Sequence, residues 1–242
     1  MKNSIEVINL SKSYKTKKAV NNISFKIDEN EIVGLLGPNG CGKTTTIGMI
    51  LGLLKPTSGQ VLINGKNIEN NKISILHKMN FISPYIELPK KLTVNQNLIV
   101  YGKLYNIKNL NERINFLSEK LRLGDLLDKI TGELSSGQKN RVSLAKALIN
   151  DPTVLLLDEP TAALDPETAD FIRTFLEKYK EEKKISVLLA SHNMDEVKRL
   201  CNSVMMMKDG NIVDGGTPED LIENYGQKNL EEVFLKIVRK DN

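Results

Sequence analysis

The stretch of sequence that decides the fold is Gly37-Pro38-Asn39-Gly40-Cys41-Gly42-Lys43-Thr44. It fits the phosphate-cradling pattern G-x-x-x-x-G-K-[ST] at every fixed position. Glycines let the backbone curl so that its N–H groups point at an anion. Lys43 adds a positive charge, and the Thr44 hydroxyl is a ligand for Mg²⁺. The stretch therefore predicts a site for a nucleoside triphosphate and its metal.

The segments on either side of this loop support that prediction. Residues 31–36 form a short apolar run suited to a buried strand, and residues 44–54 show the apolar periodicity of a helix. The start of that helix would face the phosphates, where free N–H groups favour an anion. A phosphate loop alone does not separate kinases, GTPases, helicases and transport motors, so the rest of the chain has to discriminate.

Length and composition narrow the class of protein. A chain of 242 residues can bury a full core as one large domain with a smaller insertion. The formal charge of +4 comes from 34 basic and 30 acidic residues, which is too mild a balance to indicate a nucleic-acid partner. The two cysteines suggest no disulfide framework, and no apolar run approaches the ~18 residues that span a bilayer. We expect a soluble chain in a reducing cytoplasm.

The order of apolar patterns predicts an α/β fold. Strands are expected at residues 5–10, 23–27 and 60–68, the last of them a hairpin turning at Asn64-Gly65. Continuous apolar runs at 154–157 and 185–189 flank a helical pattern, which is typical of parallel strands buried on both faces. These patterns predict a P-loop NTPase core with a mixed or parallel sheet and an N-terminal antiparallel β subdomain.

The helical periodicity of the middle of the chain predicts an insertion within that core. Residues 93–150 form a helical subdomain in this interpretation, while residues 1–92 and 151–216 form the catalytic core. A hairpin at 203–213 is followed by Thr217-Pro218, which predicts a helix start, so 217–242 is expected to be helical. All of these parts belong to one domain of 242 residues.

Two acids follow the apolar run 154–157 directly. Ligands of α/β proteins bind at the carboxyl ends of the strands, so Asp158 and Glu159 are placed for chemistry. An acid there holds Mg²⁺, and a second acid orients and deprotonates the water that attacks the γ-phosphate. We assign Asp158 to the metal and Glu159 to the base.

A second anion-binding turn is predicted at Leu134-Ser135-Ser136-Gly137-Gln138, ahead of a helix whose body is 139–149. The first loop already wraps one triphosphate, so a second phosphate site is best used on the nucleotide of another molecule. The hypothesis is a two-fold sandwich in which each copy completes the site of its partner.

These motifs, taken in order, resemble the nucleotide-binding subunit of an ATP-binding cassette (ABC) transporter. They are residues 37–45, 134–138, 154–160, 163–165 and His192, and the likeness covers nearly the whole chain. The resemblance implies ATP and Mg²⁺ as cofactors, Glu159 and His192 as catalytic residues, and Thr44 and Asp158 at the metal. The residues that it implies for ATP binding are Tyr14, Gly37, Pro38, Asn39, Gly40, Cys41, Gly42, Lys43, Thr44, Thr45, Ser135, Gly137, Gln138 and Asp165.

The resemblance also implies roles and partners. Tyr14 would stack on adenine, His192 would sense the γ-phosphate, and Asp165 would belong to the loop that links two copies. The expected partners are transmembrane permease subunits and a second ATPase subunit, with no nucleic acid. The tail 230–235 is similar to the ends of subunits from multicomponent export systems, which favours export. The chain would then lie on the cytoplasmic face of the cell membrane.

The chain departs from the family pattern at two places. The segment 81–85 holds no glutamine where the family has one, and Gln96 lies too far along to replace it. Ser136 stands where glycine is usual and adds a Cβ at a tight turn. These departures keep open a binding-competent regulator that hydrolyses ATP weakly. A soluble ABC engine acting on nucleic acid or ribosomes also stays open, although the chain shows one set of motifs and no sustained heptads.

One further expectation concerns reactivity. Cys41 lies beside Lys43 and next to a predicted helix start, an environment that favours a thiolate. Alkylation of Cys41 is therefore expected to block ATP binding.

Overall fold

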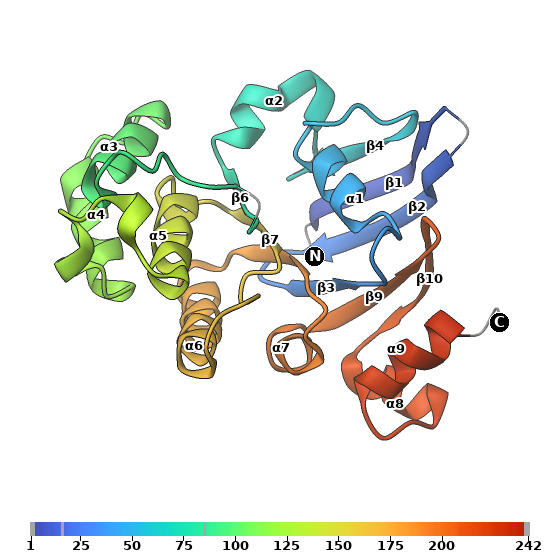
Figure 1. Ribbon diagram of the computed structural model, residues 1–242. Helices are drawn as coiled ribbons and strands as arrows, with labels where there is room; N and C mark the ends of the chain where they lie inside the picture. The colour runs from blue at the N-terminus through green and yellow to red at the C-terminus, as the bar shows by residue number, and fades with distance from the viewer. Residues whose placement is uncertain (1–2, 16, 85, 240–242) are drawn as a thin grey trace. The chain divides into compact units, whose positions relative to one another are not determined.

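The structure is a computed structural model that describes residues 3–15, 17–84 and 86–239. The chain divides into two compact units, one made of Met1–Leu76 with Ile185–Asn242 and the other of His77–Lys184. The order of the elements along the chain can be followed in Figure 1.

The first unit contains an antiparallel sheet with strand order β2-β1-β4-β5. Asn64 and Gly65 both adopt left-handed φ angles, 48° and 75°, between β4 and β5. This is the tight turn that an Asn-Gly pair favours, because neither residue resists a positive φ strongly. The predicted hairpin and the predicted antiparallel subdomain are thereby confirmed. The strands are β1 (Asn3–Tyr14), β2 (Lys17–Asp28), β4 (Ser58–Ile63) and β5 (Lys66–Asn67).

The same unit contains four neighbouring strands of a mixed sheet, in the order β10-β9-β3-β8. β3 pairs in parallel with both β9 and β8, and β10 pairs antiparallel with β9. Every residue of β3 and β8 is buried, which explains their continuous apolar sequences. The bounds are β3 (Ile32–Leu36), β8 (Ser186–Ala190), β9 (Ser203–Lys208) and β10 (Asn211–Gly216).

The helix after the phosphate loop is shorter than its sequence pattern predicts. It ends at Ile50 rather than 54, since Gly52 takes a left-handed φ of 63° and stops the helix. The predicted cap of the later helix is confirmed: Thr217 Oγ1 accepts a hydrogen bond of 3.0 Å from the Asp220 N–H. The helices of this unit are α1 (Lys43–Ile50), α2 (Ile68–Leu76), α7 (Met194–Leu200), α8 (Pro218–Tyr225) and α9 (Leu230–Arg239).

The second unit combines a pair of parallel strands with a helical cluster. β6 (Met79–Ile82) pairs with β7 (Val154–Asp158), and α3 packs against α4 and α5. Figure 1 shows these three helices grouped together in green and yellow-green. The helical character predicted for 93–150 is confirmed. The helices are α3 (Val94–Leu104), α4 (Leu110–Lys120), α5 (Ser136–Leu148) and α6 (Pro166–Lys183), with 3₁₀ turns at Gly124–Leu126 and Thr131–Glu133.

A half-buried arginine ties the helices of the second unit together. The Arg113 guanidinium donates to the backbone oxygens of Leu148 and Ile149 at the end of α5, to Asp151, and to the Tyr179 hydroxyl on α6. These bonds satisfy carbonyls that the end of a helix leaves without partners. Arg113 thus joins α4, α5 and α6 by hydrogen bonds in addition to packing.

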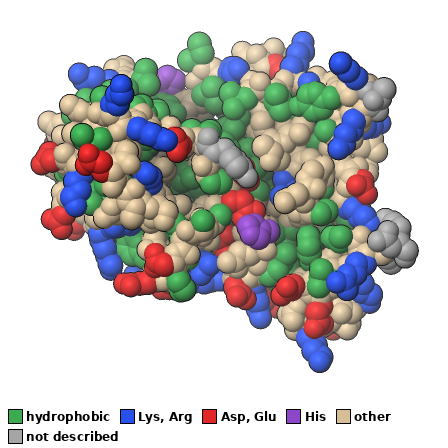
Figure 2. Space-filling model, in the orientation of Figure 1, with side chains coloured by type: hydrophobic (Ala, Val, Ile, Leu, Met, Phe, Trp, Pro, Cys, Tyr) green, Lys and Arg blue, Asp and Glu red, His purple; other side chains and the backbone are tan. Residues whose placement is uncertain are grey.

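The surface carries mixed charge. On the face drawn in Figure 2, basic and acidic side chains are interspersed with apolar ones. Among residues 3–15, 17–84 and 86–239, no helix combines the length and the apolarity needed to cross a bilayer.

Candidate functional site

The phosphate loop connects β3 to α1 and is held by backbone hydrogen bonds. The N–H of Cys41 donates to the Pro38 carbonyl at 3.2 Å, and the N–H of Gly210 donates to the Cys41 carbonyl at 2.9 Å. Gly42 is the residue before α1 and has a φ of 115°, which only glycine adopts readily. Neither a capping side chain nor an acid competes for the first N–H groups of α1. The start of α1 therefore offers them to an anion.

Two glycines of the loop are required by space as well as by backbone angle. A Cβ on Gly37 would lie 2.2 Å from the Met207 carbonyl oxygen, and one on Gly42 would lie 2.5 Å from the Ala19 carbonyl oxygen. Both obstacles are backbone atoms, which cannot swing away as a side chain can. Because β2 and β9 pass so close to the loop, a side chain at either position would clash even when no ligand is bound.

The side chains of the loop are arranged as the phosphate-site prediction requires. Lys43 Nζ folds back over the loop and donates to the carbonyls of Gly37 and Pro38, at 2.6 and 3.2 Å. Thr44 is exposed in the first turn of α1, and Thr45 is half-buried beside it. Asn39 and Gly40 are exposed at the tip of the loop. An ammonium group and a hydroxyl thus border the start of α1.

The structure does not favour the thiolate expected at Cys41. Its side chain is 3% exposed, and burial raises the pKa of the thiol, although Lys43 and backbone N–H groups act in the opposite direction. Lys43 Nζ is 4.0 Å from the sulfur and is already bonded to two carbonyls. Desolvation disfavours the charged form of a thiol, and here it outweighs the neighbouring cation. Cys41 is a packing residue of the loop.

His192 lies at the same edge of the mixed sheet as the phosphate loop. β3 and β8 are parallel with Leu35 paired to Ala190, so the segments that follow them leave the sheet side by side. The phosphate loop follows β3, and His192 follows β8 in an exposed position before α7. Within this unit the topology places the two predicted elements together at the carboxyl edge, where α/β sheets bind ligands.

Tyr14 ends β1 in the same unit. Its side chain is 46% exposed, and Lys12 Nζ lies over the ring at 5.2 Å from the centroid. An exposed ring has a free π-face for stacking, and the adjacent ammonium contributes positive charge. The arrangement suits the predicted adenine contact.

In the second unit, Asp158 and Glu159 occupy different environments. Asp158 is the last residue of β7, 5% exposed, and its Oδ2 accepts a hydrogen bond of 3.4 Å from Ser83 Oγ at the end of β6. Glu159 is half-buried and has a left-handed φ of 53°. A residue with a Cβ takes that conformation at a cost, which the surrounding structure must offset. The strain turns the chain immediately after β7.

The predicted signature turn is a helix cap. Ser135 Oγ accepts from the Gln138 N–H at 3.3 Å, and Gln138 Oε1 accepts from the Ser135 N–H at 3.0 Å. This capping box starts α5 at Ser136, three residues before the predicted helix body. A Cβ on Gly137 would lie 3.1 Å from the Thr168 methyl carbon, so glycine avoids a tight contact there. Ser136 is exposed and has no left-handed φ, so its Cβ causes no backbone strain.

Asp165 has a structural partner as well. It caps α6, its Oδ1 accepting a hydrogen bond of 2.9 Å from the Thr168 N–H. That bond to the charged form lowers the pKa of the Asp165 carboxyl. Asp165 is exposed and is followed by Pro166 at the first helical position. Its predicted role between two copies remains compatible with this cap.

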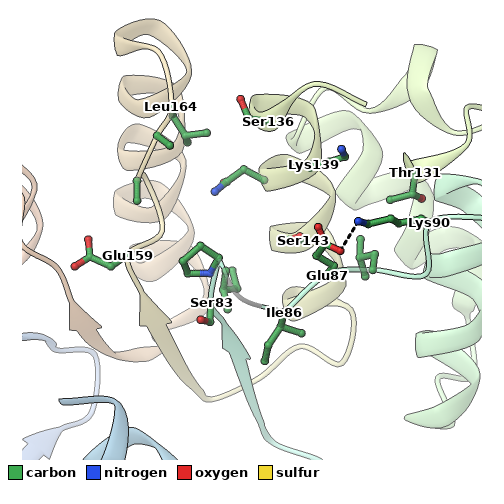
Figure 3. Close-up of a pocket in the computed structure, with 16 residues that line it drawn as sticks. Ser83, Ile86, Glu87, Lys90, Thr131, Ser136, Lys139, Ser143, Glu159 and Leu164 are labelled. Atoms are coloured by element: carbon green, nitrogen blue, oxygen red, sulfur yellow. Dashed lines mark ion pairs between the residues drawn. The ribbon is translucent and has the colours of Figure 1, made fainter. Parts of the chain in front are cut away.

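A pocket of about 250 Å³ brings several of these residues together within the second unit (Figure 3). Ser136 and Lys139 line it from α5, Glu159 from the end of β7, and Ser83 and Ile86 from the segment after β6. Ile86 is 48% exposed, so this hollow presents apolar surface. The same hollow therefore touches the signature turn, the predicted base and the segment that lacks the family glutamine.

Sequence reasoning missed Ser83, which donates to Asp158. A signal existed: Ser83 directly follows the run 79–82, and the strand formed by that run is the parallel neighbour of β7. Tyr85, the last residue of the segment 81–85 that holds no glutamine, lies outside the described residues. Each predicted site residue thus has a place in its own unit: the phosphate loop, Tyr14 and His192 in one, and the acids, the signature turn and Asp165 in the other.

Comparison with known proteins identifies the family. Residues 20–162, more than half of the chain, match the family described as ABC transporter. A second match, to an AAA domain described as a putative AbiEii toxin of a type IV toxin–antitoxin system, covers residues 131–197. The chain is 34% identical over 229 residues to the ABC transporter ATP-binding protein NatA of Bacillus subtilis, covering 93% of each.

Other relatives belong to different transport systems. The chain is 35% identical to the choline transport ATP-binding protein OpuBA of Bacillus subtilis, with 94% of this chain aligned, and it spans 61% of the length of that relative. It is 35% identical to the Nod factor export ATP-binding protein I of Burkholderia lata, covering 95% of this chain and 76% of the relative. Relatives thus include one named for choline transport and one named for export.

Solved structures agree. An ATP-binding subunit of an ABC transporter superposes with a TM-score of 0.88 at 26% identity, covering 96% of this chain and 98% of the other. A dimeric ATP-binding cassette in a post-hydrolysis state, bound to ADP and Pi, superposes at 0.80 with 27% identity, covering 88% of this chain and 98% of the other. The fold and the site elements define a P-loop ATPase. The chain belongs to the ATP-binding subunits of the ABC transporter family, as its motifs predicted.

Proposed function

We propose that this protein hydrolyses ATP as one of two paired cassettes and thereby drives export through separate membrane-spanning subunits. The observation that carries the proposal is the parallel pairing of β3 with β8, which sets the phosphate loop and His192 at one carboxyl edge of the sheet. Lys43 and the start of α1 bind the triphosphate in this proposal. His192 contacts the γ-phosphate, and Tyr14 stacks on adenine.

The residues assigned to Mg²⁺ fit that ion. Mg²⁺ takes hard oxygen ligands and keeps several waters, using one or two protein ligands together with the substrate phosphates. Thr44 supplies an exposed hydroxyl and Asp158 a carboxylate already oriented by Ser83. The described residues contain no group of three or more His, Cys, Asp or Glu that could hold a metal unaided, which agrees with a metal that arrives with its nucleotide. When bound, Mg²⁺ neutralises charge on the phosphates.

Glu159 is the proposed base. Its left-handed φ turns the carboxylate side chain out of the strand direction directly after Asp158. A carboxylate in that place accepts a proton from the water as the water oxygen attacks the γ-phosphorus. The bond from that phosphorus to the oxygen that bridges it to the β-phosphate breaks, which leaves ADP and inorganic phosphate.

The proposed partners follow from the second phosphate-binding turn. Ser135, Gly137 and Gln138 would complete the site of the facing copy, with Asp165 between the two copies. ATP then acts as a ligand that favours the closed pair, since only that state satisfies both halves of each site. The membrane subunits are proposed to hold the chain at the cytoplasmic face of the cell membrane.

Export is the proposed direction, because the tail 230–235 is similar to the ends of export-system subunits. The relative named for Nod factor export supports it, whereas the choline transport relative does not. In inside-out vesicles that carry the whole transporter, ATP added outside should make the cargo accumulate in the lumen. Loss of cargo from preloaded vesicles would instead show import.

The decisive experiment for hydrolysis is Glu159→Gln. This change keeps the side-chain volume and removes the base, so ATP turnover should fall about 100-fold or more. ATP affinity should stay within about threefold, since the triphosphate contacts are unchanged. Glu119→Gln, an exposed carboxylate on α4, serves as the matched control and should turn over ATP normally. Turnover that is equal in both variants would remove Glu159 from the mechanism.

A further inference from the structure

The loop that carries His192 is held by a buried polar cluster that the proposed function does not use. The cluster consists of Ser191, Asn193 and Glu196, which bracket His192 and reach into the first turn of α7. Ser191 is 1% exposed and Glu196 is 0% exposed. A fully buried carboxylate is rare, because removing it from water is costly unless hydrogen bonds compensate. Its presence here needs a reason.

Three hydrogen bonds connect the cluster across His192. Ser191 Oγ donates to Glu196 Oε2 at 2.6 Å, and the same hydroxyl accepts from the Asn193 N–H at 3.1 Å. Asn193 Oδ1 in turn accepts from the Glu196 N–H at 3.1 Å and caps α7. Ser191 and Asn193, on either side of His192, are therefore hydrogen-bonded to each other, and each is also hydrogen-bonded to Glu196.

The bond to the carboxylate is the strong member of this set. At 2.6 Å it is the shortest of the three and lies in the range of strong O–H···O hydrogen bonds. Glu196 accepts a hydrogen bond from the Ser191 hydroxyl, and this orients the lone pairs of that hydroxyl toward the Asn193 N–H. The carboxylate also lies near Cys201, whose thiol pKa is raised first by burial and then by Glu196.

The loop borders open space on one side. His192, Asn193 and Met194 line a groove of about 290 Å³ whose other wall is formed by Glu231, Phe234 and Leu235 in the first two turns of α9. Open space next to the loop leaves side chains room to shift. The hydrogen bonds to Glu196 restrain the backbone on the side of the loop away from solvent, where Ser191 and Glu196 are buried.

We propose that Ser191, Asn193 and Glu196 form a clamp that fixes the backbone on both sides of His192, and that Glu196 is the positioning residue of the clamp. The inference rests on the proposed role of His192 at the γ-phosphate. Glu196 touches no substrate in this proposal. It acts through the geometry of its neighbour, where a displacement of about 1 Å can cost 100-fold in rate.

Amide hydrogen exchange tests the clamp directly in the full chain. Ser191→Ala removes the hydroxyl that accepts from the Asn193 N–H, so exchange at Asn193 should become about tenfold faster. Ser58→Ala, an exposed serine on β4, is the matched control and should leave that amide unchanged. If exchange at Asn193 is the same in Ser191→Ala and in the unaltered protein, the clamp does not exist.

ATP turnover tests whether the clamp serves His192. Glu196→Ala and Ser191→Ala should each lower kcat on the order of tenfold while ATP affinity stays within about twofold, because the phosphate loop is untouched. In a His192→Ala background neither change should lower kcat further. Glu196→Gln keeps an oxygen that can accept from Ser191 and should recover most of the turnover. Equal losses with and without His192 would show a general structural role and overturn the proposal.

The two experiments also separate the inference from the proposed function. If His192→Ala alone leaves turnover unchanged, the proposed role of His192 is wrong. The rate of amide exchange at Asn193 then decides by itself whether the clamp exists. If Glu196→Ala does not fold, Ser191→Ala gives both measurements, since it removes a single oxygen atom.

Discussion

At the scale of single residues, the phosphate loop shows that backbone space and chemistry impose separate demands. Gly37 and Gly42 are required by carbonyl oxygens at 2.2 and 2.5 Å from where a Cβ would stand. Lys43 and Thr44 are required by the ligand that we propose. Glu159 meets both demands, because it carries the proposed base on a left-handed backbone. Substitutions at these positions therefore fail for different reasons, which measurement can distinguish.

Replacing Gly37 tests the spatial demand. Gly37→Ala forces a methyl group against the Met207 carbonyl, so we expect a loss of about 2 kcal/mol or more in unfolding free energy. Gly40→Ala is the matched control, since its Cβ would meet no atom within 4 Å, although its positive φ still carries a smaller cost. Urea unfolding of both variants measures the difference. Equal stabilities would mean that β9 yields easily to the added methyl group.

The cysteines supply a second test at this scale. Cys41 and Cys201 are both buried, and burial raises the pKa of each thiol. At pH 8 an uncharged alkylating reagent should modify them at least about tenfold more slowly than an unfolded cysteine. Full modification should follow denaturation. Mass spectrometry of native and denatured samples gives the rates, and rapid native labelling of Cys41 would restore the thiolate expectation.

At the scale of elements, most residues of the predicted site lie at or next to the first turn of a helix. Ser135, Asp165 and Asn193 each cap a helix, and Gly42 precedes one without a side-chain cap. Capping uses a side-chain oxygen to satisfy an N–H group of the first turn, whereas the uncapped start of α1 keeps its N–H groups for a ligand. The difference explains why a glycine precedes α1, whereas Ser135, Asp165 and Asn193 precede α5, α6 and α7.

The cap at Ser135 has a measurable value. Ser135→Ala should lower the unfolding free energy by about 1 kcal/mol, because the Gln138 N–H loses its acceptor. Ser136→Ala, one residue later and exposed, should change it by less than about 0.5 kcal/mol. Chemical denaturation without nucleotide isolates this effect from catalysis. A larger cost at Ser136 than at Ser135 would contradict the capping box.

The junction of α4, α5 and α6 predicts a pH dependence. Burial raises the pKa of Tyr179 to about 12, against the opposing influence of Arg113. A group whose folded pKa is raised contributes stability that is present below its unfolded pKa, near 10, and lost as the pH rises through 12. The loss is on the order of 3 kcal/mol.

Tyr179→Phe removes this titration. The difference in unfolding free energy between the two proteins should therefore shrink across the interval from about pH 10 to pH 12. Lysines titrate in the same range in both proteins and cancel in the comparison. A difference that stays constant with pH would show that Tyr179 ionises normally.

At the scale of the whole molecule, the proposal depends on pairing. The chain holds one phosphate loop and one signature turn, and relatives of known structure include a dimeric cassette bound to ADP and Pi. If two copies close over nucleotide, a variant that binds ATP without hydrolysing it should stay closed.

Light scattering of Glu159→Gln tests this directly. The variant should be monomeric without nucleotide and dimeric with ATP and Mg²⁺, returning to monomer when ATP is removed. Ser135→Arg in the same background places a bulky cation at the turn proposed to face the other copy and should abolish the dimer while leaving ATP bound. A dimer that persists with Ser135→Arg would exclude the signature turn from the interface.

Local patterns in the sequence were sufficient for much of the fold. The Asn64-Gly65 hairpin, the continuous runs of β7 and β8 and the Thr217 cap are confirmed, because each depends on a few adjacent residues. The family was predicted for a similar reason: five motifs occur in the required order. Helix ends were less accurate, as α1 shows, since a single left-handed glycine decides where a helix stops.

The sequence by itself determined the class of protein and the residue types at its phosphate loop, because spacing along the chain places those groups within one turn of each other. Only the tertiary structure decided which groups are buried and bonded. In the structure Cys41 is buried in the loop, Ser83 donates a hydrogen bond to Asp158, and Ser191, next to His192, donates one to Glu196. Burial depends on segments far apart in the chain, and the cost of desolvation is decided there rather than by neighbours in sequence.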